Sequence, residues 1–339
     1  MAAHSPHRAG AGTDAAARDP RPIAVTLGDP CGIGPEIVLK ACADPSLALP
    51  LRVIGDTGLL RREAARLGLP MPAQVDSIVE LGADLPVGRI DPRAGDAAWR
   101  FIVHAAHLAL RGEVRAIVTA PIAKEAMHAA GHDFPGHTEL LAELAGGVDV
   151  RMMLANPELR TVLVSIHLSL RDALGKVTFD NVLQTIVITD TALRRAGIGR
   201  PRIAVAGLNP HAGEAGMFGR EEIDTIAPAV AAARARGIEA SGPFPPDTVF
   251  MRARGLRDFD VVVAMYHDQG LIPVKYLGID DGVNVTLGLP FVRTSPDHGT
   301  AFDIAGRPGP DGRGLASAHS LLAAIREADA LSAAAPRGL

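Results

Sequence analysis

The sequence predicts an α/β fold in which a mostly parallel or mixed sheet is covered by helices on both faces. From Pro22 onward, short runs rich in Val, Ile and Ala alternate with longer amphipathic stretches of Ala, Leu and Arg, which is the pattern of βαβ units. The short runs are apolar at nearly every position, as expected for strands buried on both faces. With 339 residues, the chain is long enough for one large or two medium domains.

The expected elements follow one another in regular alternation. Strands are expected at residues 23–27, 51–55, 116–120, 161–166, 202–208 and 261–266. Helices are expected at Thr57 to Leu67, Ala97 to Leu110, Asn181 to Ala196, Glu221 to Arg236 and Ala316 to Ala328. Gly and Pro mark the joints, and the GRPGPDGRG segment at 306–314 is expected to be an exposed loop.

Composition excludes several classes of protein. Lys+Arg 34 against Asp+Glu 38 gives a formal charge of -4, and aromatic residues make up 4%, so no basic, aromatic-rich surface for nucleic acid is expected. Cys31 and Cys42 are the only cysteines, too few for a disulfide framework or a Cys-rich zinc site. Residues 1–20 lack the apolar segment of a secretory signal, and no apolar run is long enough for a membrane span. We therefore expect a cytoplasmic protein with a disordered tail at 1–20 and a small-molecule partner.

Three histidines directly follow predicted strands. His167 comes after TVLVSI, His211 after AVAGLNP and His267 after VVVAMY. Ligands of α/β proteins bind beyond the carboxyl ends of strands, so polar residues at these positions are favoured as functional. A single histidine there is most often a satisfied polar residue, but three imidazoles with an open position suit Zn, Mn, Co or a similar divalent ion. The separations of 44 and 56 residues mean that only the tertiary fold can assemble such a site.

Two carboxylates lie close to these histidines in sequence. Asp268 immediately follows His267, and Asp247 lies in the turn GPFPPDT. Both residue types commonly cap turns, and a carboxylate also often accepts the second ring proton of a metal-bound histidine. Capping and a functional role are equally supported at this point.

A second set of residues suggests an anion site. Lys275 lies within IPVKYLG and Arg293 within LPFVRTS, so each places a charge in an otherwise core-like segment. Charges rarely enter such segments unpaired. They are either structural ion pairs or, with the PGHTE segment (135–139) and Asn284, part of a cradle for a phosphate or carboxylate.

The glycine-rich segment TLGDPCGIGPEI (26–37) leads from the first strand into a helix. Its spacing is G-x-x-x-G-x-G instead of the G-x-G-x-x-G of dinucleotide-binding loops, so it is a weak fingerprint for a nucleotide. Any tight strand-to-helix turn also needs glycine.

Six blocks of the sequence, in order, resemble the 4-hydroxythreonine-4-phosphate dehydrogenase family of pyridoxal phosphate (pyridoxine) biosynthesis. They are TLGDPCGIGPEI (26–37), VTAPIAKEAM (118–127), PGHTELLAE (135–143), GLNPHAGE (207–214), AMYHDQG (264–270) and VNVTLGLPFVRTSPDHGTAFDIAG (283–306). The outer blocks GIGPE and HGTAFDIAG also resemble isocitrate and isopropylmalate dehydrogenases. This implies a two-lobed α/β/α fold with the active site in the cleft between the lobes.

The resemblance divides the chain into two lobes. Residues 21–135 with 285–339 would form a first lobe on the cofactor side. Residues 136–284 would form a second lobe with the metal site and the dimer interface. The implied assembly is a homodimer with a shared active site.

The resemblance implies an oxidoreductase that oxidises 4-hydroxy-L-threonine 4-phosphate at C3, with NAD or NADP as acceptor. Loss of the carboxylate as carbon dioxide would then give 3-amino-2-oxopropyl phosphate. One divalent metal per site (Zn, Mg, Co or Mn) would lower the proton affinity of the C3 oxygen.

Site residues are implied by their positions in the matched blocks. The metal ligands would be His167, His211 and His267, and the cofactor contacts His298, Gly299 and Asp303. The substrate contacts would be His137, Thr138, Lys275, Asn284 and Arg293. Lys275, Asp247 and Asp268 are the alternatives for proton handling.

The chain departs from the family pattern at a few positions. Cys31 stands where Ala is usual, and GEAGMFGREE, IDDGVN and GRPGPDGRG differ from the usual form. These changes make it similar to relatives that oxidise 4-phospho-D-threonate and 4-phospho-D-erythronate, which carry a C2 hydroxyl in place of the amine. That substrate class is the alternative, and cyclic dihydrodiol dicarboxylates are a third choice. A different class is a non-catalytic sensor of a phosphorylated metabolite, which would have no evident need for metal-binding histidines.

Overall fold

An eleven-stranded mixed sheet runs through the computed structural model, which describes residues 19–278 and 281–333. The strand order is β3-β2-β1-β4-β11-β10-β5-β6-β9-β7-β8. The strands are β1 (Ile23–Thr26), β2 (Leu51–Gly55), β3 (Val75–Ser77), β4 (Ala116–Thr119), β5 (Arg151–Ala155), β6 (Arg160–Leu163), β7 (Ile203–Ala206), β8 (Ala240–Phe244), β9 (Val261–Ala264), β10 (Val283–Leu287) and β11 (Val292–Pro296). Strands from the N-terminal half and from the C-terminal half of the chain therefore belong to one sheet.

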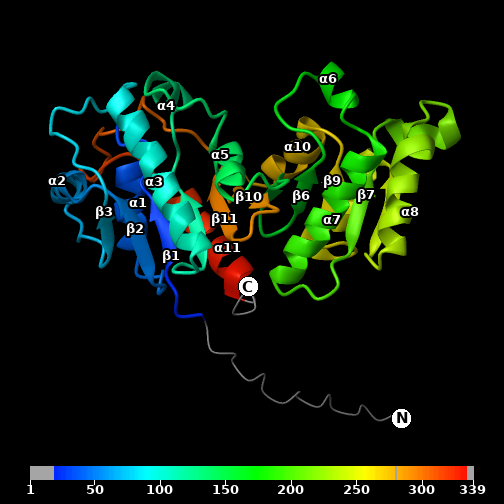
Figure 1. The fold of residues 1–339 in the computed structure, drawn as a ribbon, viewed down its shortest axis with the longest axis horizontal. Helices are drawn as coiled ribbons and strands as arrows, with labels where there is room; N and C mark the ends of the chain where they lie inside the picture. The colour runs from blue at the N-terminus through cyan, green and yellow to red at the C-terminus, as the bar shows by residue number, and fades with distance from the viewer. Residues whose placement is uncertain (1–18, 279–280, 334–339) are drawn as a thin grey trace, which may run out of the picture.

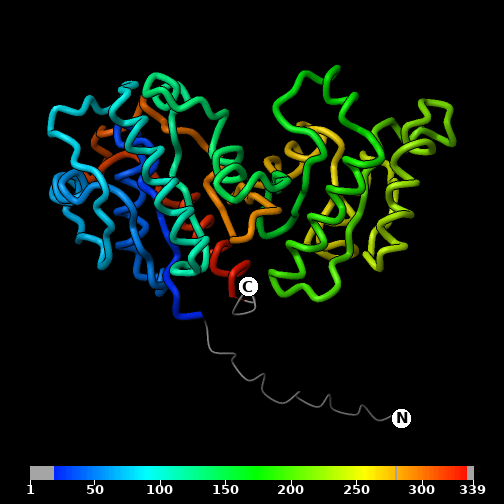
Figure 2. The backbone as a smooth tube through the Cα atoms, viewed as in Figure 1, coloured from blue at the N-terminus to red at the C-terminus, as the bar shows by residue number. Residues whose placement is uncertain are grey.

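The strand direction reverses in the middle of the sheet. β1 to β4 and β11 run parallel to one another. β6 to β9 form a second parallel set. β10 is antiparallel to both neighbours, β11 and β5, and β5 is antiparallel to β6. The two parallel sets consequently point in opposite directions, and Figure 2 shows the orange β10–β11 segment at their junction.

Eleven α-helices cover the described part of this sheet. They are α1 (Gly34–Cys42), α2 (Thr57–Leu67), α3 (Pro92–Leu110), α4 (Lys124–Ala129), α5 (His137–Leu144), α6 (Leu170–Leu174), α7 (Phe179–Arg195), α8 (Ala227–Ala235), α9 (Pro246–Ala253), α10 (His267–Leu277) and α11 (His319–Ala333). Figure 1 shows α3 lying over the strands of the first set and α7 and α8 beside those of the second. α11 packs on β4, β10 and β11, where the two sets meet.

Helix boundaries follow from local sequence. Asp56 caps α2 by accepting a hydrogen bond from the backbone N–H of Gly58, and the left-handed Gly68 ends it. Thr178 caps α7 in the same way by accepting from the N–H of Asn181. These polar and glycine residues explain why α2 begins and ends where the sequence predicts.

The six predicted strands are all present, each within three residues of its expected end. The 202–208 and 261–266 strands stop early, at Ala206 and Ala264. The helix expected from Glu221 to Arg236 is divided, because a π-helical turn at Glu222–Ile226 precedes α8. The last helix starts at His319 instead of Ala316, since the Ser317 hydroxyl accepts a hydrogen bond from the N–H of His319 and caps it. The 306–314 segment is mostly exposed, as predicted.

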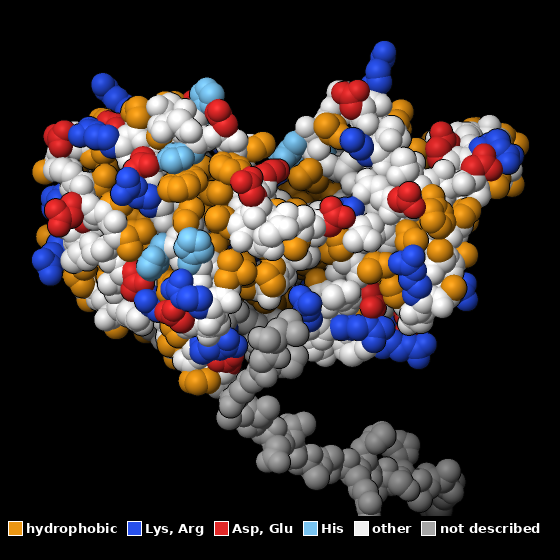
Figure 3. Space-filling view, viewed as in Figure 1, with side chains coloured by type: hydrophobic (Ala, Val, Ile, Leu, Met, Phe, Trp, Pro, Cys, Tyr) orange, Lys and Arg blue, Asp and Glu red, His pale blue; other side chains and the backbone are white. Residues whose placement is uncertain are grey.

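The core spans the whole sheet. β1, β4, β7 and β9 are buried at every residue, as expected for strands covered on both faces. One cluster of buried apolar side chains includes Ile23 and Val118 of the first set as well as Val162 and Val205 of the second. β10 itself crosses the predicted lobe boundary between 284 and 285, so the division into lobes stays a prediction. Figure 3 shows the surface hollowed at the top of the view, between α5 and α6.

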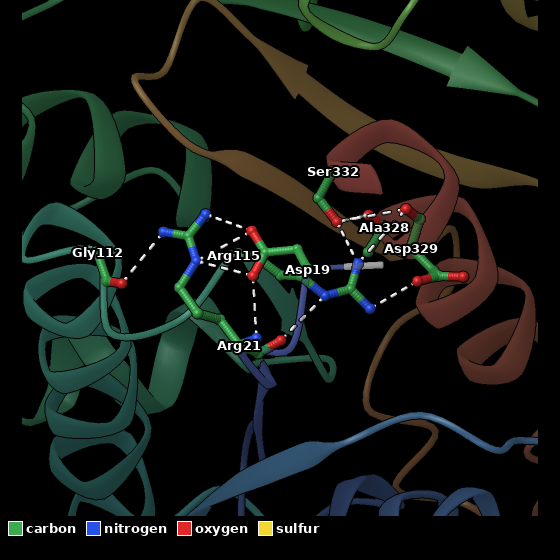
Figure 4. Close-up of polar contacts among 7 residues, drawn as sticks. All are labelled: Asp19, Arg21, Gly112, Arg115, Ala328, Asp329 and Ser332. Carbon is green, nitrogen blue, oxygen red and sulfur yellow. Dashed lines mark hydrogen bonds and ion pairs between the residues drawn. The ribbon is translucent and has the colours of Figure 1, made fainter. Parts of the chain in front are cut away.

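The start of the described chain is fixed to its end by a buried arginine (Figure 4). The Arg115 guanidinium donates to the backbone oxygen of Arg21, to the hydroxyl of Ser332 and, at 2.6 Å, to the carboxylate of Asp329. Asp19 in turn pairs with Arg21. Asp19 thus makes defined contacts, whereas residues 1–18 of the predicted tail lie outside the described residues. No helix in the described ranges is both long and apolar enough to cross a bilayer.

Candidate active site

A polar pocket of about 470 Å³ lies over the junction of the two strand sets. Its walls come from the ends of β4 and β11, from β10, from the start of α5 and from the segment after β6. The predicted site residues that line it are His137, Thr138, His167, Asn284, Arg293, His298 and Gly299. Residues from both predicted lobes therefore meet in one cavity.

Arg293 is the buried cation of this pocket. Its side chain lies on β11 with 3% exposure, and it donates to the hydroxyls of Thr286 (3.1 Å) and Thr119 (2.6 Å). Within the described residues it has no carboxylate partner at ion-pair distance. Burial lowers the pKa of the guanidinium to about 10, although the charge of Glu139 opposes this shift. A buried, positively charged group without a counter-ion is the condition that favours anion binding.

Several polar atoms around Arg293 also lack partners. Among the described residues, Nε of Arg293, Nε2 of His137 and Oδ1 of Asn284 are buried without a hydrogen bond. Burial strongly lowers the pKa of His137, and the charges of Arg293 and Lys124 add to this effect. Because buried polar groups in native proteins are nearly always satisfied, this cluster indicates a polar ligand.

The first turn of α5 contributes a further anion-binding element. The helix begins with His137 and Thr138, and no side chain caps it because its N-cap residue is Gly136. The first backbone N–H groups of a helix have no partner within the helix, and the helix dipole places positive charge there. The start of α5 and Arg293 therefore face the same pocket with complementary features for a phosphate.

Lys275 reaches the pocket through an ion pair. It lies in the last turn of α10, and its Nζ is 2.7 Å from Oδ2 of Asp297, which directly follows β11 and lines the pocket. Of the two sequence interpretations of Lys275, the structural ion pair is present. A contact of Lys275 with an anion stays a prediction.

The predicted metal histidines are only partly brought together. The rings of His167 and His267 lie 5.7 Å apart. Nδ1 of His267 is 2.8 Å from the carboxylate of Asp268, which leaves Nε2 free to bind a metal. Burial lowers the pKa of His167, with smaller effects from Lys124 and His267, so its neutral, metal-binding form is favoured. These two donors fit a divalent ion.

His211 does not join this pair in the described chain. It lies in the turn Pro210–Gly216, where its own φ and those of the next four residues are positive, and its ring faces Phe218 at 6.5 Å. The buried carboxylate of Glu222 holds this turn by accepting hydrogen bonds from the backbone N–H groups of Leu208 and Asn209. No three His, Cys, Asp or Glu side chains within 19–278 and 281–333 are arranged to hold a metal. The triad stays a prediction.

The segment after β11 borders the pocket on the side predicted for the cofactor. His298 and Gly299 line the pocket, and the next residue, Thr300, accepts a hydrogen bond from the N–H of Ile33. The glycine-rich segment and the HGTAFDIAG block are therefore neighbours. Asp303 is exposed and is not among the pocket residues.

The two proton-handling carboxylates differ in position. Asp268 contacts His267, as described above. Asp247 lies in the first turn of α9, is exposed, and does not line the pocket. Only Asp268 is therefore in contact with a predicted site residue in the described chain.

Sequence reasoning missed four charged or polar groups of the pocket. They are Thr119, Lys124, Ser295 and Asp297, whereas Glu139 belongs to the PGHTE segment already assigned to the predicted anion site. Lys124 and Glu139 stand within blocks that carry the family resemblance, and Lys124 shortly follows the strand 116–120. The rule that polar residues after strands are functional would have identified Lys124 and Asp297.

Comparisons with known proteins give a consistent result. The family model described as pyridoxal phosphate biosynthetic protein PdxA matches residues 38–328. The chain is 53% identical over 331 residues to a 4-hydroxythreonine-4-phosphate dehydrogenase of Beijerinckia indica, covering 93% of this chain and 96% of that one. It is 49% identical over 302 residues to a D-threonate 4-phosphate dehydrogenase of Salmonella typhimurium, covering 84% and 92%. The solved structure of 4-hydroxythreonine-4-phosphate dehydrogenase from Klebsiella pneumoniae superposes with a TM-score of 0.83 at 47% identity, covering 92% and 99%.

Proposed function

The chain belongs to the PdxA family of pyridoxal phosphate biosynthetic proteins, and from this premise we propose that it oxidises a phosphorylated four-carbon hydroxy acid. The leading substrate is 4-hydroxy-L-threonine 4-phosphate. The hydrogen removed from C3 passes as hydride to NAD or NADP, and the hydroxyl proton goes to a base. The C1–C2 bond then breaks to release carbon dioxide, its electron pair stays on C2 as an enolate, and C2 takes up a proton. The product is 3-amino-2-oxopropyl phosphate.

The observation that carries this proposal is the unpaired charge of Arg293. A guanidinium with 3% exposure and no carboxylate within ion-pair distance in the described chain favours a ligand with a strong negative charge. The uncapped start of α5 and the unpartnered nitrogen of His137 face the same space. The oxygens of one phosphate group would interact with all three of these groups.

The chemistry at C3 requires groups that the histidine pair and the neighbouring segment suit. A divalent ion, when bound, supplies positive charge that lowers the proton affinity of the C3 hydroxyl, and a nicotinamide accepts hydride. His167 and His267 would hold the ion, with His211 as the third ligand. Asp268 fixes the tautomer of His267 by accepting a hydrogen bond from its Nδ1–H group. His298, Gly299 and Asp303 are the proposed cofactor contacts.

The remaining groups of the site handle charge and protons. Lys275, paired with Asp297, can hold an anion. Lys275, Asp268 and Asp247 are the proposed groups for proton handling, and contact with His267 favours Asp268. Asn284 and Thr138 orient the substrate oxygens from the pocket wall.

We also propose a cytoplasmic homodimer with a shared active site. α10, which carries His267 and Lys275, leaves Ile272 62% and Tyr276 90% exposed. Met217, in the segment after His211, is 75% exposed. Large apolar side chains exposed together beside a functional site are typical of a protein interface. In such a dimer, the partner would supply the contacts that His211 lacks within one chain.

The second candidate substrate is a phosphorylated sugar acid, 4-phospho-D-threonate or 4-phospho-D-erythronate. A relative with 49% identity is named D-threonate 4-phosphate dehydrogenase, which favours this candidate. These compounds share the phosphate, the carboxylate and the C3 hydroxyl with the leading substrate. The same cradle at Arg293 would accept either class.

The test compares the three substrates with the purified protein. NAD and NADP reduction is followed by absorbance, with each divalent metal (Zn, Mg, Co, Mn) added in turn. Turnover of the amino acid alone supports a role in cofactor biosynthesis, and preference for a sugar acid supports the second candidate. Tight binding of all three with no reduction under any condition would contradict both and favour a sensor.

A further inference from the structure

The proposed substrate is negatively charged at both ends, whereas the groups described so far account for one. Phosphate at one end meets Arg293 and the start of α5. The carboxylate lies at the opposite end of the four-carbon chain. A second positively charged group is needed there, because a buried carboxylate without a partner is costly.

The two lysines near the pocket differ in whether a carboxylate forms an ion pair with them. Lys275 is neutralised by Asp297 at 2.7 Å, and the Asp297 side chain is only 15% exposed. Lys124 lines the pocket, and no carboxylate of residues 19–278 and 281–333 lies within ion-pair distance of it. Glu139, the other pocket carboxylate, likewise has no ion-pair partner in that part of the chain, and its Oε2 would lie 3.4 Å from a methyl group built on Gly136.

Lys124 lies beside the start of α5, in the pocket that His137 and His167 also line. A methyl group built on Gly136, the residue before α5, would be 3.5 Å from Cε of Lys124 and 3.9 Å from its Nζ. Burial lowers the pKa of His137, and the charges of Arg293 and Lys124 lower it further. The Lys124 ammonium therefore lies near the start of α5, in the same cavity as His167.

The backbone that carries Lys124 is held firmly. Lys124 is the first residue of α4, and α4 packs against α3. The contact is so close that a methyl group on Gly95 of α3 would lie 2.0 Å from the carbonyl oxygen of Ala126. The flexible side chain of Lys124 thus extends from a fixed base, which reduces the entropy lost when it binds a ligand.

We infer that Lys124 binds the carboxylate of the substrate, the group that is lost as carbon dioxide. This inference rests on the proposed function, because it assumes a substrate with a phosphate and a carboxylate. It makes Lys124 the group that distinguishes a phosphorylated acid from the corresponding alcohol.

Two ligands that differ only in the carboxylate test this inference. 4-Phospho-D-erythronate carries the carboxylate, and D-erythritol 4-phosphate has a CH₂OH group in its place. Binding of each is measured by titration calorimetry without nicotinamide. The proteins are the wild type, Lys124→Met and Lys124→Arg, with Lys176→Met as a matched control because Lys176 is exposed and outside this pocket. Circular dichroism verifies that each variant is folded.

Lys124→Met is expected to weaken binding of the acid by roughly 10- to 100-fold, the effect of one charge-assisted contact. Binding of the alcohol should change less than about twofold, and Lys124→Arg should restore part of the affinity for the acid. Equal losses for both ligands would place Lys124 at the phosphate and overturn the inference. Unchanged binding of the acid would overturn it as well, as would a wild type that binds the alcohol as tightly as the acid.

These binding measurements, taken together with the NAD and NADP reduction assay described above, separate this inference from the proposed function. If the wild type prefers the acid through Lys124 but reduces neither NAD nor NADP with any substrate, the carboxylate contact stands and the dehydrogenase proposal fails. If turnover is present and the Lys124 variants bind both ligands normally, the dehydrogenase proposal stands and the carboxylate lies elsewhere.

Discussion

Replacing Arg293 with methionine should abolish phosphate binding and should destabilise the ligand-free protein less than the same substitution of a buried arginine that is paired with a carboxylate. Methionine keeps most of the length and apolar volume of the side chain and removes its charge. Arg293 is 3% exposed, and a buried side chain of this size would ordinarily be expected to contribute strongly to stability. The charge of Arg293 reverses that expectation.

The magnitude follows from opposing contributions. The fall of the pKa to about 10 corresponds, at about 1.4 kcal/mol per pH unit, to a cost of about 3 kcal/mol for keeping the buried guanidinium charged. The substitution removes this cost but also removes the hydrogen bonds to Thr119 and Thr286, which are worth about 1.5 to 3 kcal/mol each. The balance of these contributions is a fall of the free energy of unfolding by no more than about 3 kcal/mol.

Arg115→Met is the matched control. Arg115 is also buried, but its charge is paired with Asp329 at 2.6 Å and it donates to Ser332. Removing one partner of a buried pair leaves the other uncompensated, at a cost of about 3 kcal/mol or more. Arg115→Met should therefore destabilise the protein more than Arg293→Met, although the two arginines have similar exposure.

Urea unfolding with and without inorganic phosphate measures both effects. Phosphate should stabilise the wild type and Arg115→Met by binding to the folded state, and should not stabilise Arg293→Met. The reasoning is refuted if Arg293→Met loses as much stability as Arg115→Met. It is also refuted if phosphate still stabilises the Arg293 variant.

Four further substitutions test other parts of the structure. Asp29 is fully buried and burial raises its pKa to about 6, so the folded state binds more protons and stability is lost as pH rises through that value. Asp29→Asn should thus raise the free energy of unfolding by about 3 kcal/mol at pH 7.5 and by less at pH 5, as measured by urea unfolding at both pH values. Burial depresses the pKa of His137, so wild-type stability should fall as pH drops below about 6.5, and His137→Gln should reduce this slope in the same assay. Gly95→Ala should destabilise by about 2 kcal/mol or more because its methyl group would overlap α4, whereas Gly199→Ala, with no atom nearby, should change the melting temperature little. His211→Ala should remove bound metal, measured by elemental analysis, without lowering the melting temperature of the metal-free protein; full metal content would contradict the proposed triad.

The outer strands were predictable because burial on both faces leaves a simple signal. β1, β2, β4, β7 and β9 are mostly apolar, β6 continues into the apolar run Val162–Leu163–Val164, and all six were identified. The strands of the sheet centre were not. β10 contains Asn284 and β11 contains Arg293, and these polar residues, which serve the site, interrupt the apolar pattern. β8 contains Gly242 and Pro243 and is tolerated because it forms an edge of the sheet.

The candidate site was predictable where a residue violates the local pattern. The charge of Arg293 within an apolar segment has no place in an ordinary core, and the structure puts it in the pocket wall. Lys124 does not interrupt an apolar segment, and its place shortly after the strand at 116–120 is the only sequence signal for it. Its position depends on the packing of α4 near the start of α5. The strand-end rule also could not show that His211 lies in a turn with positive φ angles, where its ring faces Phe218.

The strands at which the sheet reverses direction, β10 and β11, come late in the sequence, and this has a consequence for synthesis on the ribosome. β4 and β5 obtain their inner neighbours, β11 and β10, from residues 283–296, so each is an edge strand until that late segment has emerged. The first 282 residues therefore present two exposed edges with strong β-forming sequences. Nascent chains that stall before this point would be prone to aggregation, and chaperones that shield strand edges should be needed most in the final stage of translation.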